Sequence, residues 1–473
     1  MNKEKLKRIF ISVFAIYAAL TVSFYFLAGD QIRYRDSRFM EVMKEANKST
    51  EELVKGTVIE QRFTNKVDRL KSVSFKVTTY YRDVHGLLYV ELLDSSNNLV
   101  LKKIYNVADF SEGDVITLES KDYLDSLAEK NLILRFHADS EPGQAISLLM
   151  NGYTEYGNIL VNNKFENGML CFSTTGQELI FTGEYYWYFV LAGAVLLGLL
   201  LIISYKDFCK DRLNYLVIGI RAIDKYQFLI NQLVLRDFKT KYKRSILGVF
   251  WSFLNPLMTM TVQYFVFSAF FDNDTKNYPV YLLIGVICYS FFNEATTMCL
   301  TSIAHNDRLI TKVYVPKYIF PLSRTISSSV NLGISIVPLL LVGLFTGLVF
   351  KKAAILALFF LVCLVVFVLG FGMILATLMV FFRDIQFLWS VICMIWMYAT
   401  PIFYPAYIIP PKYSFVQTFN PLYQCIKNIR ICLIDGISPE PRAYLYTFLM
   451  CFAWLIIGSF VFKKQQDKFT LYL

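Results

Sequence analysis

The chain has 473 residues, of which 55% are hydrophobic and only 18% are charged, and its mean hydropathy is +0.45. This composition is typical of a membrane protein and excludes an ordinary soluble enzyme. The formal net charge of +10 does not indicate nucleic-acid binding, because most of the cations flank apolar segments on one side, and we expect no nucleic-acid partner.

Eight segments contain about the 20 mostly apolar residues that a helical membrane span needs. They lie near residues 9–28, 186–204, 249–271, 279–300, 325–349, 353–381, 385–404 and 443–462. The first follows "MNKEKLKR", but its apolar run is too long for a signal peptide, and Phe26 breaks the small-residue cleavage pattern before Gly29. The sequence therefore predicts an uncleaved anchor and an α-helical polytopic membrane protein of about eight transmembrane helices.

The distribution of lysine and arginine predicts the orientation, because short cytoplasmic loops carry the excess of these residues. With the N-terminus inside, "SYKDFCKDR", "HNDRLITKVYVPKY", "FFRD" and "KKQQDK" all lie inside, and Lys351 and Lys352 are a minor exception. We therefore expect a multi-pass protein of the cytoplasmic membrane with both termini cytoplasmic and residues 30–185 outside.

Residues 30–185 differ in composition from the spans around them. Short alternating runs such as "VSFKVTTYY", "LLYVELLD", "NLVLKKIY", "DVITLES" and "NLILRFHA" are separated by turn-rich spacers, a rhythm typical of an antiparallel β-sandwich. A helix is expected before them, because "RFMEVMKEANKSTEELV" does not alternate. The rhythm resembles that of jelly-roll carbohydrate-binding modules, without a diagnostic motif. Tyr153, Tyr156 and Phe172 are glycan-stacking candidates, with burial in the core as the alternative.

Cysteine and histidine give no sign of a metal site or a disulfide framework. The hydrophilic insert contains only Cys171, so it cannot close an internal disulfide. Cys425 and Cys432 are seven residues apart, about 10 Å on a helix, which is beyond disulfide reach. We expect no metal ligands and no cofactor in this chain.

The stretch "FLINQLVLRDFKTKYKRSI" joins a cationic segment directly to an apolar one. On a helical wheel one stripe is apolar, and it consists of Phe228, Leu235, Phe238, Tyr242 and Ile246. A helix of this kind lies in the membrane interface with its apolar face toward the acyl chains and its cations toward the headgroups. Simple anchoring beside a span is the alternative.

Four blocks of sequence resemble the permease subunit of type-2 ABC exporters for polysaccharides, O-antigen and teichoic acid. The first is "LRDFKTKYKRSILGVFWSFLNPL", with Arg236, Asp237, Lys239, Tyr242, Ser245, Leu247, Gly248, Trp251, Pro256 and Leu257 at the matching positions. The others are "NDRLITKVYVPKYIFPLSR", "FFRDI", and "TPIFYP" followed by "NPLYQCIKNIR". The resemblance covers roughly residues 226–473, so two further spans and the insert precede it.

The apolar segments and the alternating runs predict an anchor at 1–29, an outer domain at 30–185, a second span at 186–205, and a linker and interface helix at 206–247. The resemblance implies a six-span permease core at 248–473. It also implies a homodimer that works with a separate ATPase subunit, which binds ATP and Mg²⁺. This chain has no G-x-x-x-x-G-K-[ST] loop and is not expected to be an enzyme.

Residues 304–320 would be the coupling helix that contacts the ATPase. The matching positions there are Asn306, Leu309, Ile310, Lys312 and Pro316, and Pro316 and Pro321 are expected to interrupt helices. An ordinary cytoplasmic loop is the alternative.

The cargo implied by the resemblance is a glycan or teichoic acid on a polyprenyl diphosphate. Its diphosphate would meet the cations of the interface helix, namely Arg236, Lys239, Lys241, Lys243 and Arg244. Headgroup anchoring is the competing interpretation of these cations.

The pathway for the glycan is expected to be lined by aromatic rings, because these stack on sugars without a fixed hydrogen-bond register. The candidates are Trp251, Tyr264, Trp389, Trp396, Tyr398 and Phe403, with packing as the alternative for each. Glu294 is an acid within a span and is expected to face protein or water, as a structural partner or a substrate contact. The proline-interrupted segment 405–436 is predicted to be re-entrant.

Three other functions fit parts of the sequence. A type-2 exporter of drugs or small lipids has the same architecture, because a fold does not determine its cargo. A polyprenyl-sugar glycosyltransferase would use outward carboxylates such as Asp30 or Asp272 to Asp274, but it would not need the interface and coupling blocks. A membrane-anchored glycan sensor would explain the insert but not six further spans.

Overall fold

The structure is a computed structural model that describes residues 3–40, 46–125, 127–152, 158–210, 215–243, 246–271, 275–312 and 315–472. It contains two compact units, one comprising Met1–Ile32 and Trp187–Leu473 and the other Arg33–Tyr186. The second unit begins three residues after, and ends one residue after, the insert that the sequence predicts at 30–185.

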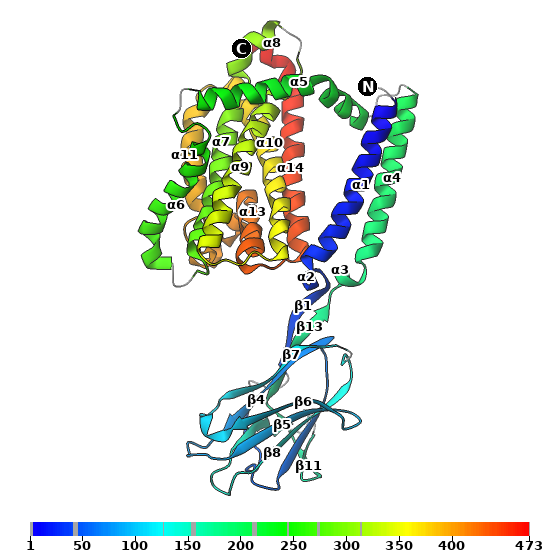
Figure 1. The fold of residues 1–473 in the computed structure, drawn as a ribbon, viewed down its shortest axis with the longest axis vertical. Coiled ribbons are helices and arrows are strands. Elements are labelled where there is room, and N and C mark those ends of the chain that lie inside the picture. The colour runs from blue at the N-terminus through cyan, green and yellow to red at the C-terminus, as the bar shows by residue number, and fades with distance from the viewer. Residues whose placement is uncertain are drawn as a thin grey trace. The chain divides into compact units, whose positions relative to one another are not determined.

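The first unit is helical (Figure 1). Its longer helices are α1 (Lys3–Ala28), α4 (Tyr186–Cys209), α5 (Tyr215–Tyr242), α6 (Phe250–Phe271), α7 (Tyr278–Leu300), α9 (Ile319–Phe345), α10 (Ala357–Phe381), α11 (Ile385–Ala399), α13 (Pro421–Arg430) and α14 (Pro441–Gln465). Within the described residues, six helical segments are long and apolar enough to cross a membrane, and they contain α1, α4, α7, α9, α10 and α14. The chain is therefore a polytopic membrane protein.

The other two predicted spans are helices of a different kind. Helix α6 has 22 residues, and polar side chains such as Ser252 and Asn255 lower its hydropathy. Helix α11 has only 15 residues, about 22 Å, which is shorter than the hydrocarbon core. The prediction that this span continues to residue 404 is wrong, because Thr400 precedes a proline and takes an extended conformation that ends the helix.

Helices α7, α9, α10 and α14 form the packed centre of the helical unit, and α5 runs across one end of it (Figure 1). Helices α10 and α14 meet at two glycines. A Cβ atom on Gly458 would lie 1.9 Å from the carbonyl oxygen of Gly370, so this contact depends on the missing side chain. The close approach lets the two backbones pack without an intervening side chain.

The first two spans are joined to each other and to α5. The hydroxyl of Tyr17 in α1 donates a 2.9 Å hydrogen bond to the carbonyl oxygen of Val190 in α4. Lys5 forms a hydrogen-bonded ion pair with Asp224 of α5, and the hydrogen bond from Lys5 lowers the pKa of the Asp224 carboxyl. An apolar cluster of Leu6, Phe10, Phe208 and Val217 completes the junction.

The second unit is a β-sandwich of two antiparallel sheets, as the alternating runs predict. One sheet has the order β1-β13-β4-β9-β12, with β2 on β9 and β7 on β4, and the other has the order β11-β10-β3-β8-β5-β6. The strands are β1 (Tyr34–Met40), β2 (Lys48–Ser49), β3 (Val58–Thr64), β4 (Arg69–Thr78), β5 (Leu87–Asp94), β6 (Leu99–Asn106), β7 (Val115–Leu124), β8 (Asn131–Ala138), β9 (Ser147–Asn151), β10 (Asn158–Val161), β11 (Lys164–Asn167), β12 (Met169–Leu170) and β13 (Phe172–Leu179).

The core of the sandwich lies between the sheets. Phe75 of β4 and Phe136 of β8 come from opposite sheets, and their ring centroids are 4.8 Å apart in a T-shaped contact. Both rings are almost completely buried, as is Phe172. Burial of such rings contributes about 1.5–3 kcal/mol each, so the sandwich has a substantial core of its own.

The predicted helix at the start of the insert is wrong for the residues that the structure describes. Arg38 to Met40 belong to β1, which pairs with β13 from Tyr34↔Leu179 to Met40↔Ser173, and Lys48 and Ser49 form β2 on β9. The helix was predicted because the segment does not alternate. These short strands join the sheet by backbone hydrogen bonds and have no regular apolar face that the sequence could reveal. Pairing of β1 with β13 brings the two ends of the domain together.

Cys171 lies in the sandwich core and should be chemically inert in the folded protein. Burial raises the pKa of its thiol to about 11, and its side chain has no exposed surface. Because the thiolate is the reactive form, we expect Cys171 to resist iodoacetamide at pH 8 and to react after denaturation. Peptide mass spectrometry measures this labelling, and exposed Cys209 is the internal control. Rapid labelling of native Cys171 would contradict the described core.

Candidate functional site: two polar cavities beside the interface helix

The end of helix α5 is held by ion pairs and hydrogen bonds to other parts of the helical unit. Asp237 is buried and accepts from Nη1 of Arg324 in α9 at 2.8 Å. Its neighbour Arg236 donates to Oδ1 of Asn306 at 3.3 Å, and the amide of Asn306 donates to the carbonyl oxygen of Ser302 at 2.7 Å. These contacts connect the interface helix both to α9 and to the predicted coupling segment.

One turn further along α5, Lys241 pairs with the acid inside helix α7. Its Nζ lies 2.8 Å from Oε1 of Glu294, and the same oxygen accepts from Nδ2 of Asn331 in α9 at 2.7 Å. Asn331 in turn accepts from the hydroxyl of Tyr242 at 3.0 Å, and Tyr242 contacts the hydroxyl of Ser252 in α6. Glu294 therefore has structural partners, and the network joins α5, α6, α7 and α9.

Two cavities adjoin this network. The larger one, which we call the vestibule, has a volume of about 580 Å³. Its walls are Arg236, Asp237, Thr240, Lys241, Glu294, Met298, His305 and Arg324. Three permanent cations and two acids lie here, so the vestibule has a positive balance even with its ion pairs formed. A cavity of this kind favours anions, and guanidinium groups suit phosphate oxygens in particular.

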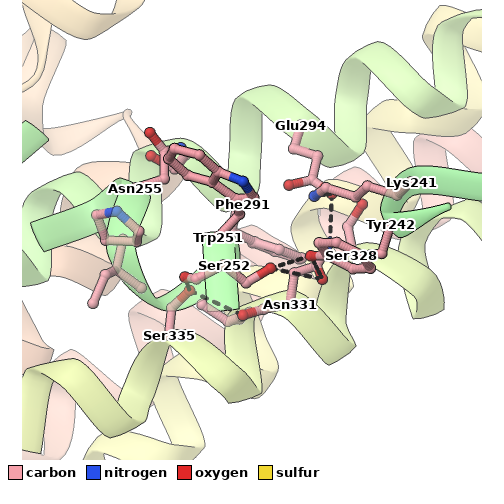
Figure 2. A pocket seen from close by; sticks show the side chains of 14 residues that line it. Lys241, Tyr242, Trp251, Ser252, Asn255, Phe291, Glu294, Ser328, Asn331 and Ser335 are labelled. Carbon is pink, nitrogen blue, oxygen red and sulfur yellow. Dashed lines mark hydrogen bonds and ion pairs between the residues drawn. The ribbon is translucent and has the colours of Figure 1, made fainter. Parts of the chain in front are cut away.

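The inner cavity lies next to the vestibule and has a volume of about 190 Å³. It is lined by Lys241, Tyr242, Trp251, Ser252, Asn255, Pro256, Ile287, Ser290, Phe291, Glu294, Ser328, Asn331, Leu332 and Ser335. Figure 2 shows the labelled side chains of this set converging on one space, with Ser252, Tyr242 and Asn331 joined by hydrogen bonds. Hydroxyl and amide groups dominate its polar surface.

The structure divides the predicted cations of the interface helix into two groups. Arg236 and Lys241 line the vestibule, whereas Lys239 and Lys243 line a surface groove that also reaches Arg236 and Gln232. Arg244 lies outside the described residues. The apolar stripe predicted for this helix does not meet one environment, because Phe228 and Leu235 are exposed whereas Tyr242 lines the inner cavity. Ile230 and Leu233, which lie outside the stripe, are buried in the helical core.

The predicted coupling segment 304–320 contains the 3₁₀ turn Ala304–Asn306 and helix α8 (Asp307–Lys312). Ile310 is buried and Leu309 packs against the same core, whereas Lys312 is exposed and Pro316 is half-buried. Pro321 does not interrupt a helix as predicted. It occupies the first turn of α9, which begins at Ile319, and proline is tolerated there because no intrahelical hydrogen bond is lost.

Of the predicted channel aromatics, Trp251 lines the inner cavity in the part of the chain that the structure describes. Trp389 and Phe403 are buried in the helical core. Their rings therefore pack against other side chains and do not form a channel surface as predicted. The Trp396 indole donates to Asn420 at 3.1 Å. Tyr264 packs near Tyr278, with ring centroids 6.1 Å apart, and Tyr398 is exposed.

The fourth sequence block forms a buried hydrogen-bond network around Arg430, at the end of the bundle opposite α5 (Figure 1). We call this network the Arg430 lock. Arg430 of α13 is almost completely buried and donates to the carbonyl oxygens of Pro401 at 2.7 Å, Ile402 at 2.9 Å and Tyr281 at 3.1 Å. Asn420 donates to Thr400 at 2.8 Å. These bonds satisfy the irregular backbone of "TPIFYP", which is how non-helical backbone is tolerated inside a membrane protein.

The segment predicted as re-entrant, 405–436, forms short helices. They are two 3₁₀ turns at Ala406–Ile408 and Pro411–Tyr413, α12 (Ser414–Thr418), α13 and a π-helical turn at Ile431–Asp435. Helix α13 has ten residues and is too short to span a membrane. Its position relative to the bilayer stays a prediction.

The predicted glycan-stacking residues of the sandwich do not form a surface site in the described structure. Phe172 is completely buried, and its ring lies 4.9 Å from that of Phe63, so the prediction is wrong for this residue. Tyr153 and Tyr156 lie outside the described residues. Phe172 is in the core because a large aromatic ring stabilises the fold most when it is buried.

Several cavity residues were missed from the sequence, chiefly Arg324, Ser328, Asn331 and Ser335 of α9. Their spacing of three or four residues places them on one helical face within a span. A polar stripe of this kind on an apolar helix indicates a polar cavity or a helix contact. It does not appear in a hydropathy average, because the apolar residues between its members outweigh it. His305 gave no separate signal, because only the fold brings it beside Arg236.

Comparison with known proteins identifies the helical region. Residues 228–434 match the family described as ABC-2 type transporter. The chain is 30% identical over 240 residues to the O-antigen export system permease protein RfbA of Klebsiella pneumoniae, which is 50% of this chain and 91% of that protein. RfbA of Myxococcus xanthus is 25% identical over 253 residues, 53% of this chain and 97% of that protein.

The polysialic acid transport protein KpsM of Escherichia coli is 20% identical over 241 residues, 50% of this chain and 93% of that protein. The family match contains both cavities, the coupling segment and the Arg430 lock. The chain therefore belongs to the ABC-2 type transporter family, with export permeases for O-antigen and polysialic acid among its relatives.

Proposed function

We propose that this chain is the transmembrane subunit of an ATP-driven exporter that moves a polyprenyl-diphosphate-linked polysaccharide or teichoic acid across the bacterial cytoplasmic membrane. The observation that carries the proposal is the vestibule, where Arg236, Lys241 and Arg324 converge beside the coupling segment. Similarity to nearly the whole length of polysaccharide export permeases supports the cargo class.

The vestibule cations would receive the diphosphate of the lipid carrier. Arg236 is half-exposed and pairs weakly with Asp237 at 3.3 Å, so its guanidinium keeps donors for a ligand. Arg324 is held by Asp237 in a fixed orientation, which lowers the entropic cost of binding an anion. Lys239 and Lys243, which do not line the vestibule, would attract anionic lipid headgroups instead.

Energy would come from a separate ATPase subunit that binds ATP and Mg²⁺. Exposed Lys312 on α8 is available for contact with that subunit, while buried Ile310 fixes α8 to the helical core. The hydrogen bond between Asn306 and Arg236 would transmit movement of the coupling segment to the interface helix.

Two copies of the chain would form the pathway. Large apolar side chains are exposed along α6 and α11, including Phe265, Phe270, Phe387 and Ile395. Such faces are covered by lipid or by another subunit in a membrane protein. A second copy would use part of this surface.

The distribution of lysine and arginine supports cytoplasmic termini and an outer location for the sandwich. In that orientation the sandwich would meet the exported glycan or an envelope partner at high effective concentration, because both of its ends are tethered.

Deletion of the gene in its native bacterium tests the function. We expect loss of surface polysaccharide and accumulation of its lipid-linked form inside the cell, both restored by the wild-type chain. Wild-type polysaccharide export together with altered transport of a drug or small lipid would overturn the proposal and support the alternative cargo. Protease treatment of intact spheroplasts tests the location of the sandwich, and complete protection would contradict an outer location.

Charge reversal at Lys312 tests coupling. Lys312→Glu should leave the complex with the ATPase assembled but reduce transport per ATP hydrolysed several-fold, because the exposed cation lies on the coupling segment. The matched control is Lys352→Glu, an exposed lysine in the 3₁₀ helix Lys352–Leu356 that precedes α10. Purified complexes in proteoliposomes allow both rates to be measured, and equal ratios in the two variants would contradict the coupling role.

A further inference from the structure

The two cavities share an ion pair but differ in chemistry. Lys241 and Glu294 line both cavities, so the vestibule and the inner cavity meet at this 2.8 Å pair. Beyond the shared pair, the vestibule is lined by charged groups such as Arg236 and Arg324, whereas every other residue of the inner cavity is uncharged. A ligand that occupied both would carry an anionic group joined to an uncharged polar group.

Three polar side chains on the inner wall have unused hydrogen-bonding capacity. Among the described residues, the indole of Trp251, the amide of Asn255 and the hydroxyl of Ser290 make no side-chain hydrogen bond to the protein. By contrast, Ser335 on the opposite wall already bonds to the carbonyl oxygen of Ser252 at 3.3 Å. The α6 and α7 sides of the cavity therefore present available donors and acceptors.

The helical spacing explains why these groups face one space. Trp251 and Asn255 are four residues apart on α6, and Ser290 and Glu294 are four apart on α7, so each pair lies on one helical face. Phe291 adds a second aromatic ring to the wall (Figure 2). Amides and hydroxyls next to aromatic faces suit a ligand with hydroxyl groups and apolar C–H faces.

The size of the inner cavity limits its occupant. Its volume of about 190 Å³ lies below the roughly 300–1,000 Å³ of pockets for drug-sized ligands, so it accepts one ring rather than an extended chain. An uncharged wall also disfavours a phosphate, which would lose hydration without gaining a cation other than Lys241.

We infer that the inner cavity binds the first sugar of the cargo, the one joined directly to the lipid diphosphate, while the diphosphate lies in the vestibule. This inference rests on the proposed function. Asn255 and Ser290 bond to sugar hydroxyls, and Trp251 packs against the sugar ring. Lys241, at the junction, contacts the diphosphate and marks the boundary between the two subsites. The arrangement selects lipid carriers that already bear a sugar.

Binding of two lipid probes to the full chain in nanodiscs tests the inference. The probes are undecaprenyl diphosphate and undecaprenyl diphosphate bearing one N-acetylglucosamine, measured by native mass spectrometry against each other. Wild type should prefer the sugar-bearing lipid by about tenfold, the size expected for one or two hydrogen bonds. Asn255→Leu and Ser290→Ala should each remove most of that preference while still binding the sugar-free lipid.

Two controls separate the possible failures. Thr261→Val changes an exposed polar residue of α6 that does not line the cavity, and it should keep the wild-type preference. Arg324→Gln should weaken both lipids. If wild type binds both lipids equally, or Asn255→Leu and Ser290→Ala keep the preference, the sugar subsite is wrong while the exporter proposal stands. If wild type binds neither lipid, the result contradicts both the proposed cargo and the sugar subsite.

Discussion

Replacing Arg430 with leucine should cause the largest loss of stability in the helical unit. Its guanidinium donates to three backbone carbonyl oxygens, those of Tyr281, Pro401 and Ile402, and also lies 3.3 Å from the Tyr281 ring centroid. Each hydrogen bond to a charged group contributes about 1.5–3 kcal/mol, and leucine would leave all three acceptors buried without that donor. We expect the thermal midpoint of the purified chain to fall by at least about 10 °C.

Two further variants show whether geometry or charge is responsible. Arg430→Lys keeps the charge but lacks the planar fork that reaches several carbonyls at once, so it should recover only a small part of the stability. Lys427→Leu removes an exposed cation one turn earlier on α13 and should change the midpoint little. Stability is measured as the fraction that stays monodisperse after heating in detergent. A midpoint for Arg430→Leu close to that of Lys427→Leu would contradict the lock.

Removing the carboxylate of Asp237 should have the second large effect. Its side chain is 4% exposed and pairs with Arg324, which is 15% exposed, so Asp237→Ala leaves a largely buried cation without its acid. Breaking a buried pair on one side costs about 3–5 kcal/mol. We expect a lower thermal midpoint and strongly reduced cargo-stimulated ATP hydrolysis, because the interface helix loses its ion pair with α9.

The double variant Asp237→Ala with Arg324→Leu separates the orphan charge from the lost contact. Stability should recover partly, because no unpaired cation remains, whereas cargo stimulation should not recover, because the vestibule has lost a cation. Lys239→Gln on the exposed face of the same helix is the matched control and should keep wild-type stability. If the double variant is less stable than Asp237→Ala, the ion pair does not account for the loss.

Local patterns were sufficient for most of the secondary structure. The run at 87–94 and the run at 131–138 coincide with β5 and β8, because short runs rich in β-branched, aromatic and leucine residues with partial alternation fit a half-buried sheet. Errors arose where local pattern and pairing disagree. Residues 38–40 join β1 through backbone bonds to β13, and α11 ends at Ala399 because Pro401 acts on the residue before it.

The candidate site divides in the same way. The sequence by itself determined that Arg236 and Lys241 are cations next to an apolar segment and that Glu294 is an acid within one, because composition and hydropathy are properties of the chain. Only the tertiary structure decided that Lys241 pairs with Glu294 and that Asp237 is buried against Arg324. Contacts between residues 53 or 87 positions apart depend on how helices cross, and no local pattern encodes that crossing.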